Sequence, residues 1–159
     1  DRIHRGVDWG WYPDQYAFLR THYDSTRERI YLIDELYVNK WKNDKTGAWI
    51  KGKGYDDNDM ICDSAEPKSV GDYRDMGLPA RGAKKGPGSV EYGFKWLQSR
   101  TIVIDPKRTP NACKEITEYE YERDKDGNVI TGYPDENDHA ISALRYAYEP
   151  VFNRRGNRA

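Results

Sequence analysis

Residues 3–11 read Ile-His-Arg-Gly-Val-Asp-Trp-Gly-Trp, an apolar approach that runs into one acid, Asp8, and then into a glycine-aromatic turn. The run from Ile3 to Asp8 is typical of a short β-strand, and residues 10–13 are typical of the hairpin that follows it. An acid at the end of a buried strand has a rigidly held backbone and faces a cleft. Metal ligands must be fixed to within about half an ångström, so Asp8 is a candidate metal ligand.

Two further strands follow this first one. Residues 15–22 carry rings and apolar side chains, and residues 29–38 (Arg-Ile-Tyr-Leu-Ile-Asp-Glu-Leu-Tyr-Val) give the strongest strand signal in the chain. Residues 23–28, between them, are rich in turn formers. Residues 1–38 therefore predict a three-stranded antiparallel meander.

The rest of the chain alternates between strands and helices. Buried strands are predicted over 60–63 and 100–105, and helices over 67–76, 90–99, 110–121 and 137–149, with Ser64, Ser89 and Thr109 as caps. The connections are a loose helix or long loop over 39–59, a glycine-rich loop over 78–88 and a small hairpin over 122–132. This order predicts an α/β fold, in which a mixed sheet combines the antiparallel meander with parallel strands and has helices on both faces.

Length and composition limit the class of protein. The 159 residues suffice for one domain with a full core. The formal net charge of −1 does not mark a nucleic-acid binder, so any basic surface must be local. Cys62 and Cys113 match no zinc spacing and are interpreted as buried thiols. No apolar stretch approaches the roughly 20 residues that span a bilayer, and no signal peptide opens the chain, so we expect a soluble cytoplasmic protein.

The ends of the chain give a domain prediction. We expect one domain over residues 1–150 and a basic tail over 151–159, because the tail carries three arginines and shows no packing signal. The chain opens on Asp1 rather than on methionine, and its first strand begins almost at once. We therefore expect it to be part of a longer or processed chain.

Two more acids occupy settings comparable to that of Asp8. Asp63 ends a short apolar run, and a first strand beside a later parallel strand would place Asp8 and Asp63 about 5 Å apart. Carboxylates this close repel each other unless a cation lies between them, and all-oxygen ligation suits Mg²⁺ or Mn²⁺. Asp138 starts the last predicted helix, where it is either the helix cap or a third ligand.

Three segments together resemble the nuclease domain of tailed-phage large terminase subunits. They are residues 6–10 (Gly-Val-Asp-Trp-Gly), 61–67 (Ile-Cys-Asp-Ser-Ala-Glu-Pro) and 137–147 (Asn-Asp-His-Ala-Ile-Ser-Ala-Leu-Arg-Tyr-Ala), of which the third is the most specific. The resemblance implies a ribonuclease H-like fold whose acids bind two divalent cations, Mg²⁺ or Mn²⁺. It also implies endonucleolytic cleavage of concatemeric double-stranded DNA during genome packaging in the host cytoplasm.

The resemblance extends to individual residues. Asp8 matches the family's first-strand acid and Asp63 its fourth-strand acid. Family members usually have a further acid four residues after Asp138, where this chain has Ser142. Residues 138 and 142 lie one turn apart on the same helix face, so we expect Asp138 to be the third ligand; otherwise the site is incomplete.

Two other residues have implied roles in this site. Asp14 resembles an extra acid of some members, and is a candidate ligand of the second metal or an outer-shell group. His139 is either a ligand or a proton shuttle near the leaving oxygen, or else a helix-start histidine bonded to the backbone. The implied catalytic set is Asp8, Asp63, Asp138 and His139, and the implied metal ligands are Asp8, Asp63, Asp138 and Asp14.

The predicted glycine-rich loop carries Arg81, Lys84 and Lys85. Either it follows the phosphate backbone of DNA, with contacts that give affinity without sequence preference, or it is a solvated loop. The resemblance implies other partners as well: an ATPase domain in the full-length protein, whose Gly-x-x-x-x-Gly-Lys-Ser/Thr motif this chain lacks, the small terminase subunit and the portal, but no membrane.

Two alternative functions remain. The first is a junction resolvase or transposase-like nuclease, against which the segment 137–147 argues. The second is a weakly active domain that binds DNA or a portal, for which Ser142 leaves room.

Overall fold

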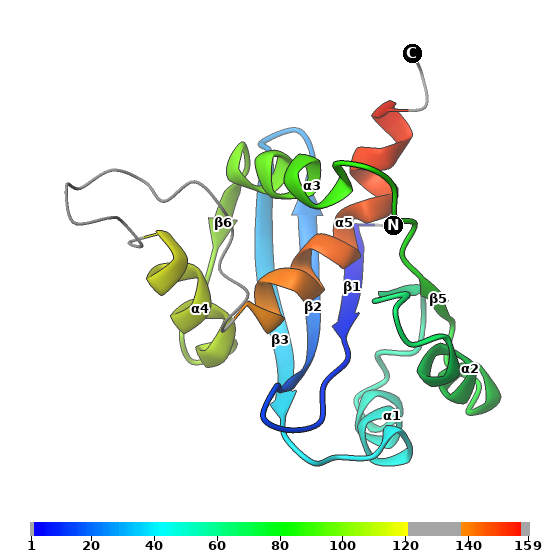
Figure 1. Cartoon of the computed structure of the whole chain (residues 1–159). Coiled ribbons are helices and arrows are strands. Elements are labelled where there is room, and N and C mark those ends of the chain that lie inside the picture. Colours follow the sequence, from blue (N-terminus) through cyan, green and yellow to red (C-terminus); the bar gives the residue numbers. More distant parts are fainter. Residues whose placement is uncertain (1, 121–137, 157–159) are drawn as a thin grey trace.

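The computed structural model describes residues 2–120 and 138–156, which form one mixed sheet and five helices (Figure 1). The strands are β1 (Ile3–Asp8), β2 (Tyr16–Asp24), β3 (Arg29–Val38), β4 (Met60–Cys62), β5 (Ala80–Gly82) and β6 (Thr101–Val103). The helices are α1 (Asn43–Gly52), α2 (Pro67–Asp75), α3 (Ser89–Gln98), α4 (Pro110–Glu120) and α5 (His139–Gly156).

The sheet has the order β5-β4-β1-β2-β3-β6. β1, β2 and β3 pair antiparallel, which confirms the predicted meander. β4 pairs parallel to β1 with Val7 opposite Cys62, and the N–H of Asp63 donates to the carbonyl of Val7 over 2.9 Å. Asp8 and Asp63 therefore lie next to each other, at the C-terminal ends of the neighbouring parallel strands β1 and β4.

Helices cover both faces of the sheet, as predicted. Side chains alternate along β2, so Phe18 packs with α1 and α2 on one face, while Leu19 packs with α3, α4 and α5 on the other. The first face has the buried residues Ile50, Val70 and Tyr73, and the second has Trp96, Ala112 and Leu144.

A glycine sets how closely α5 approaches the sheet. Figure 1 shows α5 running across β1 and β2, with which it makes most of its contacts. A Cβ placed on Gly6 would stand 1.8 Å from the carbonyl oxygen of Ala143 and 2.9 Å from the nitrogen of Ala147. Only glycine fits here, and its absent side chain lets the backbone of α5 lie directly on β1.

Several predicted boundaries are wrong. β5 was expected to be loop, and β6 is an edge strand with Thr101 and Val103 exposed rather than a buried strand. α2 begins at Pro67 as predicted and α3 at Ser89, but their N-caps are Glu66 and Gly88 rather than Ser64 and Ser89. Residues 39–59 do contain a helix, α1. The predicted hairpin over 122–132 lies outside the described residues.

The last helix differs most from its prediction. It was expected to end at residue 149 and to be followed by a tail without packing, but α5 continues through Pro150 to Gly156. Phe152 is only 2% exposed and joins the core beside Trp96. Burial of this ring offsets the backbone hydrogen bond that a proline inside a helix removes. In the described part of the chain, no helix is long and apolar enough to cross a membrane.

Candidate metal centre

The candidate centre forms where β1 and β4 end. Asp8 is the last residue of β1, and its side chain is largely buried. Asp63 follows β4, and the indole Nε1 of Trp9 donates to its carbonyl oxygen over 2.9 Å. This bond joins Trp9, the residue after Asp8, to the backbone of Asp63, and so holds the ends of β1 and β4 together.

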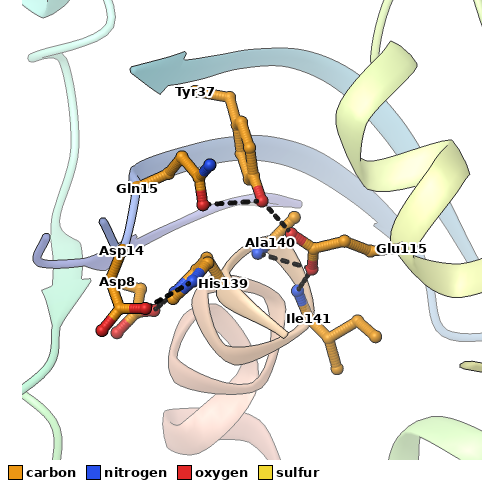
Figure 2. A network of polar contacts seen from close by, with 8 residues as sticks. All are labelled: Asp8, Asp14, Gln15, Tyr37, Glu115, His139, Ala140 and Ile141. Atoms are coloured by element: carbon orange, nitrogen blue, oxygen red, sulfur yellow. Dashed lines mark hydrogen bonds and ion pairs between the residues drawn. The ribbon is translucent and has the colours of Figure 1, made fainter. Parts of the chain in front are cut away.

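His139, the first residue of α5, contacts the candidate centre. Its Nδ1 lies 3.2 Å from Oδ2 of Asp8, and its Nε2 lies 3.5 Å from Oδ1 of Asp14. Figure 2 shows the imidazole of His139 turned toward both carboxylates. Asp14 is 75% exposed, whereas His139 is buried and the side chain of Asp8 is 13% exposed. Among the interpretations of this histidine, the structure favours one in which its side chain contacts the acids rather than the backbone.

Burial and neighbouring charges perturb both partners of this pair. Burial raises the pKa of the Asp8 carboxyl above its usual range, against the hydrogen bond from His139, and the nearby Asp63 and Asp138 raise it further. The hydrogen bond to Asp8 raises the pKa of His139, against its own burial. The site thus concentrates negative charge in a poorly solvated place, which a bound cation would relieve.

Asp138 immediately precedes α5, and its carbonyl accepts the N–H of Ser142 over 2.8 Å. An aspartate at this position commonly caps the helix with its side chain. Here the N–H groups of Ala140 and Ile141 donate to the carboxylate of Glu115 on α4, which performs that capping. Ser142, one turn after Asp138, is 8% exposed, so its side chain is buried.

The basic residues of the predicted loop have different partners. Lys85 donates to Oδ1 of Asp63 over 2.9 Å, so its ammonium lies at the edge of the acid cluster. Glu149 of α5 accepts the backbone N–H of Lys84 over 3.2 Å and pairs with Nη1 of Arg81 at 3.9 Å. α5 therefore anchors the loop at Arg81 and Lys84, and Lys85 contacts the candidate ligand Asp63.

The donor set suits a hard divalent cation, although the side chains are not in coordinating positions. Within residues 2–120 and 138–156, no group of three or more His, Cys, Asp or Glu side chains has metal-binding geometry. Asp8 instead faces His139, and Asp63 faces Lys85. Carboxylate oxygens at two strand ends and one helix start are nevertheless the ligands that Mg²⁺ and Mn²⁺ prefer.

Sequence reasoning did not single out Glu115 and Tyr37. Glu115 is 5% exposed, and its Oε2 accepts the hydroxyl of Tyr37 over 2.7 Å. The ring of Tyr37 also packs 6.4 Å from that of His139. A lone glutamate in a charged helix gives no local signal of this role, because the role depends on the packing of α4 beside α5.

An antiparallel meander, a parallel strand beside β1 and acids at both strand ends define a ribonuclease H-like nuclease fold. The family model described as "Terminase RNAseH like domain" matches residues 8–149. The chain belongs to this family, as its three sequence segments predicted.

Individual relatives agree with this assignment. The large terminase subunit of Bacillus phage SPP1 is 42% identical over 98% of this chain, and the PBSX phage terminase large subunit of Bacillus subtilis strain 168 is 31% identical over 91%. The chain spans 38% and 33% of their lengths.

Solved structures agree as well. The SPP1 large terminase nuclease domain with bound Mn matches 94% of this chain and 86% of its own, at 42% identity and a TM-score of 0.84. The nuclease domain of the P22 large terminase matches 99% of this chain and 87% of its own, at a TM-score of 0.66; at 21% identity it supports the fold alone.

Proposed function

We propose that this chain is the nuclease domain of a phage large terminase subunit, a divalent-metal-dependent endonuclease that cuts concatemeric double-stranded DNA during genome packaging. One observation carries the proposal: Asp8 and Asp63 leave adjacent parallel strands at the point where α5 brings in Asp138 and His139. The SPP1 nuclease domain, which shares this fold at 42% identity, has bound Mn.

Asp8, Asp63 and Asp138 would hold the metal, with Asp14 as an outer or second-metal ligand. Two bound cations would supply an activated water and charge stabilisation for in-line displacement at phosphorus. His139 orients the Asp8 carboxylate through Nδ1. Its Nε2 points toward the exposed Asp14, and is the atom from which we expect a proton to reach the leaving oxygen.

DNA would approach along the loop that bears Arg81, Lys84 and Lys85. A surface cavity of about 720 Å³ lies between this loop, Tyr92 of α3 and Asn153 of α5. Cations and one exposed ring beside the acid cluster suit a phosphate backbone, and such contacts carry no sequence information. We expect cleavage with little sequence preference. An ATPase domain, a small subunit and a portal in the host cytoplasm are further proposed partners.

A domain that binds DNA or a portal and cuts weakly is the second candidate. It is favoured by Ser142, where the resemblance implies an acid, and by the pairing of Asp63 with Lys85. A junction resolvase is the third, and faster cutting of branched than of linear DNA would identify it.

Cleavage of supercoiled plasmid in Mn²⁺, Mg²⁺ or EDTA tests the proposal. We expect nicking with either metal, none in EDTA, and loss of nicking in Asp8→Asn and Asp63→Asn with unchanged circular dichroism. Asp75→Asn is the matched control, because it makes the same change on an exposed side chain of α2. Parent-like cutting by Asp63→Asn would contradict the acid cluster. A folded parent that binds DNA but never cuts would favour the binding domain.

A further inference from the structure

A buried glutamate on α4 holds the start of α5. Oε1 of Glu115 accepts the N–H of Ala140 over 2.9 Å and that of Ile141 over 3.1 Å, and its Oε2 accepts the hydroxyl of Tyr37. Figure 2 shows this carboxylate on one side of the helix start, with His139 turned toward Asp8 on the other. The start of α5 therefore contacts both the Glu115 carboxylate and Asp8 of the candidate centre.

The cap is unusual in its origin. The first N–H groups of a helix have no partner within the helix, and a side chain just before the helix normally binds those of its second and third residues. Here these two N–H groups donate to a residue 25 positions earlier, on a different helix. Tertiary packing against α4 therefore holds the start of α5.

The same device fixes α4. Oε1 of Glu35 on β3 accepts the N–H of Asn111 over 2.9 Å and that of Ala112 over 3.1 Å, which are the second and third residues of α4. Tyr37, which donates to Glu115, is two residues further along β3. β3 thus positions α4, and β3 and α4 together position α5.

We propose that Glu115 is a positioning residue of the metal centre, which fixes the N-terminus of α5 so that Asp138 and His139 face Asp8. The inference rests on the proposed nuclease function and extends it to a residue whose hydrogen bonds go to the backbone of α5 and to Tyr37.

The electrostatics of the cap fit this role. Three donors face the carboxylate of Glu115, an arrangement that stabilises its ionised form. Burial acts in the opposite direction and raises its pKa. A neutral side chain of the same shape can still accept the two N–H groups, so the inference depends on hydrogen-bond geometry more than on charge.

Three variants separate positioning from general stability. Glu115→Ala removes the cap, and Glu115→Gln keeps an oxygen that can accept both N–H groups. Tyr148→Phe is the matched control. Tyr148 lies on α5 about two turns from the cap, and the substitution deletes its buried hydroxyl, which lies 2.7 Å from the hydroxyl of Thr21 on β2. Mn²⁺ affinity is measured by calorimetry, and hydrogen exchange follows the amides of Ala140 and Ile141.

We expect Glu115→Ala to lose protection at both amides and to bind Mn²⁺ about tenfold more weakly, the scale of an outer-shell substitution. Glu115→Gln is expected to restore most of the affinity. Tyr148→Phe is expected to lower the melting temperature and leave affinity unchanged. Parent-like affinity in Glu115→Ala, or an equal loss in Tyr148→Phe, would overturn the inference. A parent that neither binds Mn²⁺ nor cuts DNA would instead overturn the proposed function.

Discussion

Replacing Gly6 by alanine tests how the centre is held together. Gly6 lies on β1 two residues before Asp8, and the backbone of α5 packs against it at Ala143. The same helix carries His139 on the side of the centre. A methyl group at Gly6 would therefore act on the distance between the first strand and the last helix without touching any candidate ligand.

The structure gives the size of the effect. The new Cβ would stand 1.8 Å from a carbonyl oxygen of Ala143, about 1.6 Å short of an ordinary van der Waals contact. Backbone atoms cannot rotate away, so α5 must shift. Overpacking of this kind costs about 3 kcal/mol or more of unfolding free energy. A displacement of about 1 Å at a reacting centre lowers activity about a hundredfold.

Urea denaturation and plasmid nicking measure the two effects. Gly71→Ala is the matched control, because a Cβ there meets no atom within 4 Å and the residue lies inside α2. The control is expected to gain about 0.5–1 kcal/mol from helix propensity and to cut normally. A Gly6→Ala protein with the parent's stability and nicking rate would refute the close packing of α5 on β1.

Three further predictions concern single side chains. Lys85→Met removes the ammonium 2.9 Å from Asp63 and is expected to tighten Mn²⁺ binding about two- to fivefold in calorimetry, whereas unchanged affinity would show that Lys85 does not compete. Burial lowers the pKa of His4 to about 4. Between pH 6.5 and 4 the unfolded chain therefore binds more protons than the folded protein. The free energy of unfolding should fall by up to about 3 kcal/mol as the pH drops through that window. His4→Phe should flatten this dependence in urea titrations. Ser142→Asp adds a buried carboxylate one turn from Asp138, and should lower the melting temperature in EDTA and enlarge its rise with Mn²⁺; equal rises in both proteins would place residue 142 outside the centre.

Elements with strong local signals could be predicted from the sequence. Residues 29–38, with the strongest strand signal, form β3, and the helix predicted to start at Thr109-Pro110 is α4. β5 was missed because its three residues lie in a glycine-rich segment and its strand character comes only from pairing with β4. The continuation of α5 past Pro150 was missed because the stabilising contact, Phe152 in the core, is made across the molecule.

Some features of the candidate site could likewise be predicted from the sequence, and others could not. The neighbouring positions of Asp8 and Asp63 follow from two short apolar runs and the rule that parallel strands end at one edge, and the register of β1 and β4 confirms them. The bond between Lys85 and Asp63 and the cap from Glu115 could not be predicted, because each joins segments whose proximity exists only in the folded sheet.

The capping of α5 by Glu115 on α4 has a consequence during synthesis of the protein. The candidate centre combines Asp8 at the end of β1 with Asp138 and His139 at the start of α5, and that helix start is held by a glutamate that is itself placed by β3 and α4. A ribosome releases the first strand long before the last helix can dock. A chain that stops before α5 therefore lacks two of the residues proposed for the nuclease site, and we expect it to leave the DNA around it uncut.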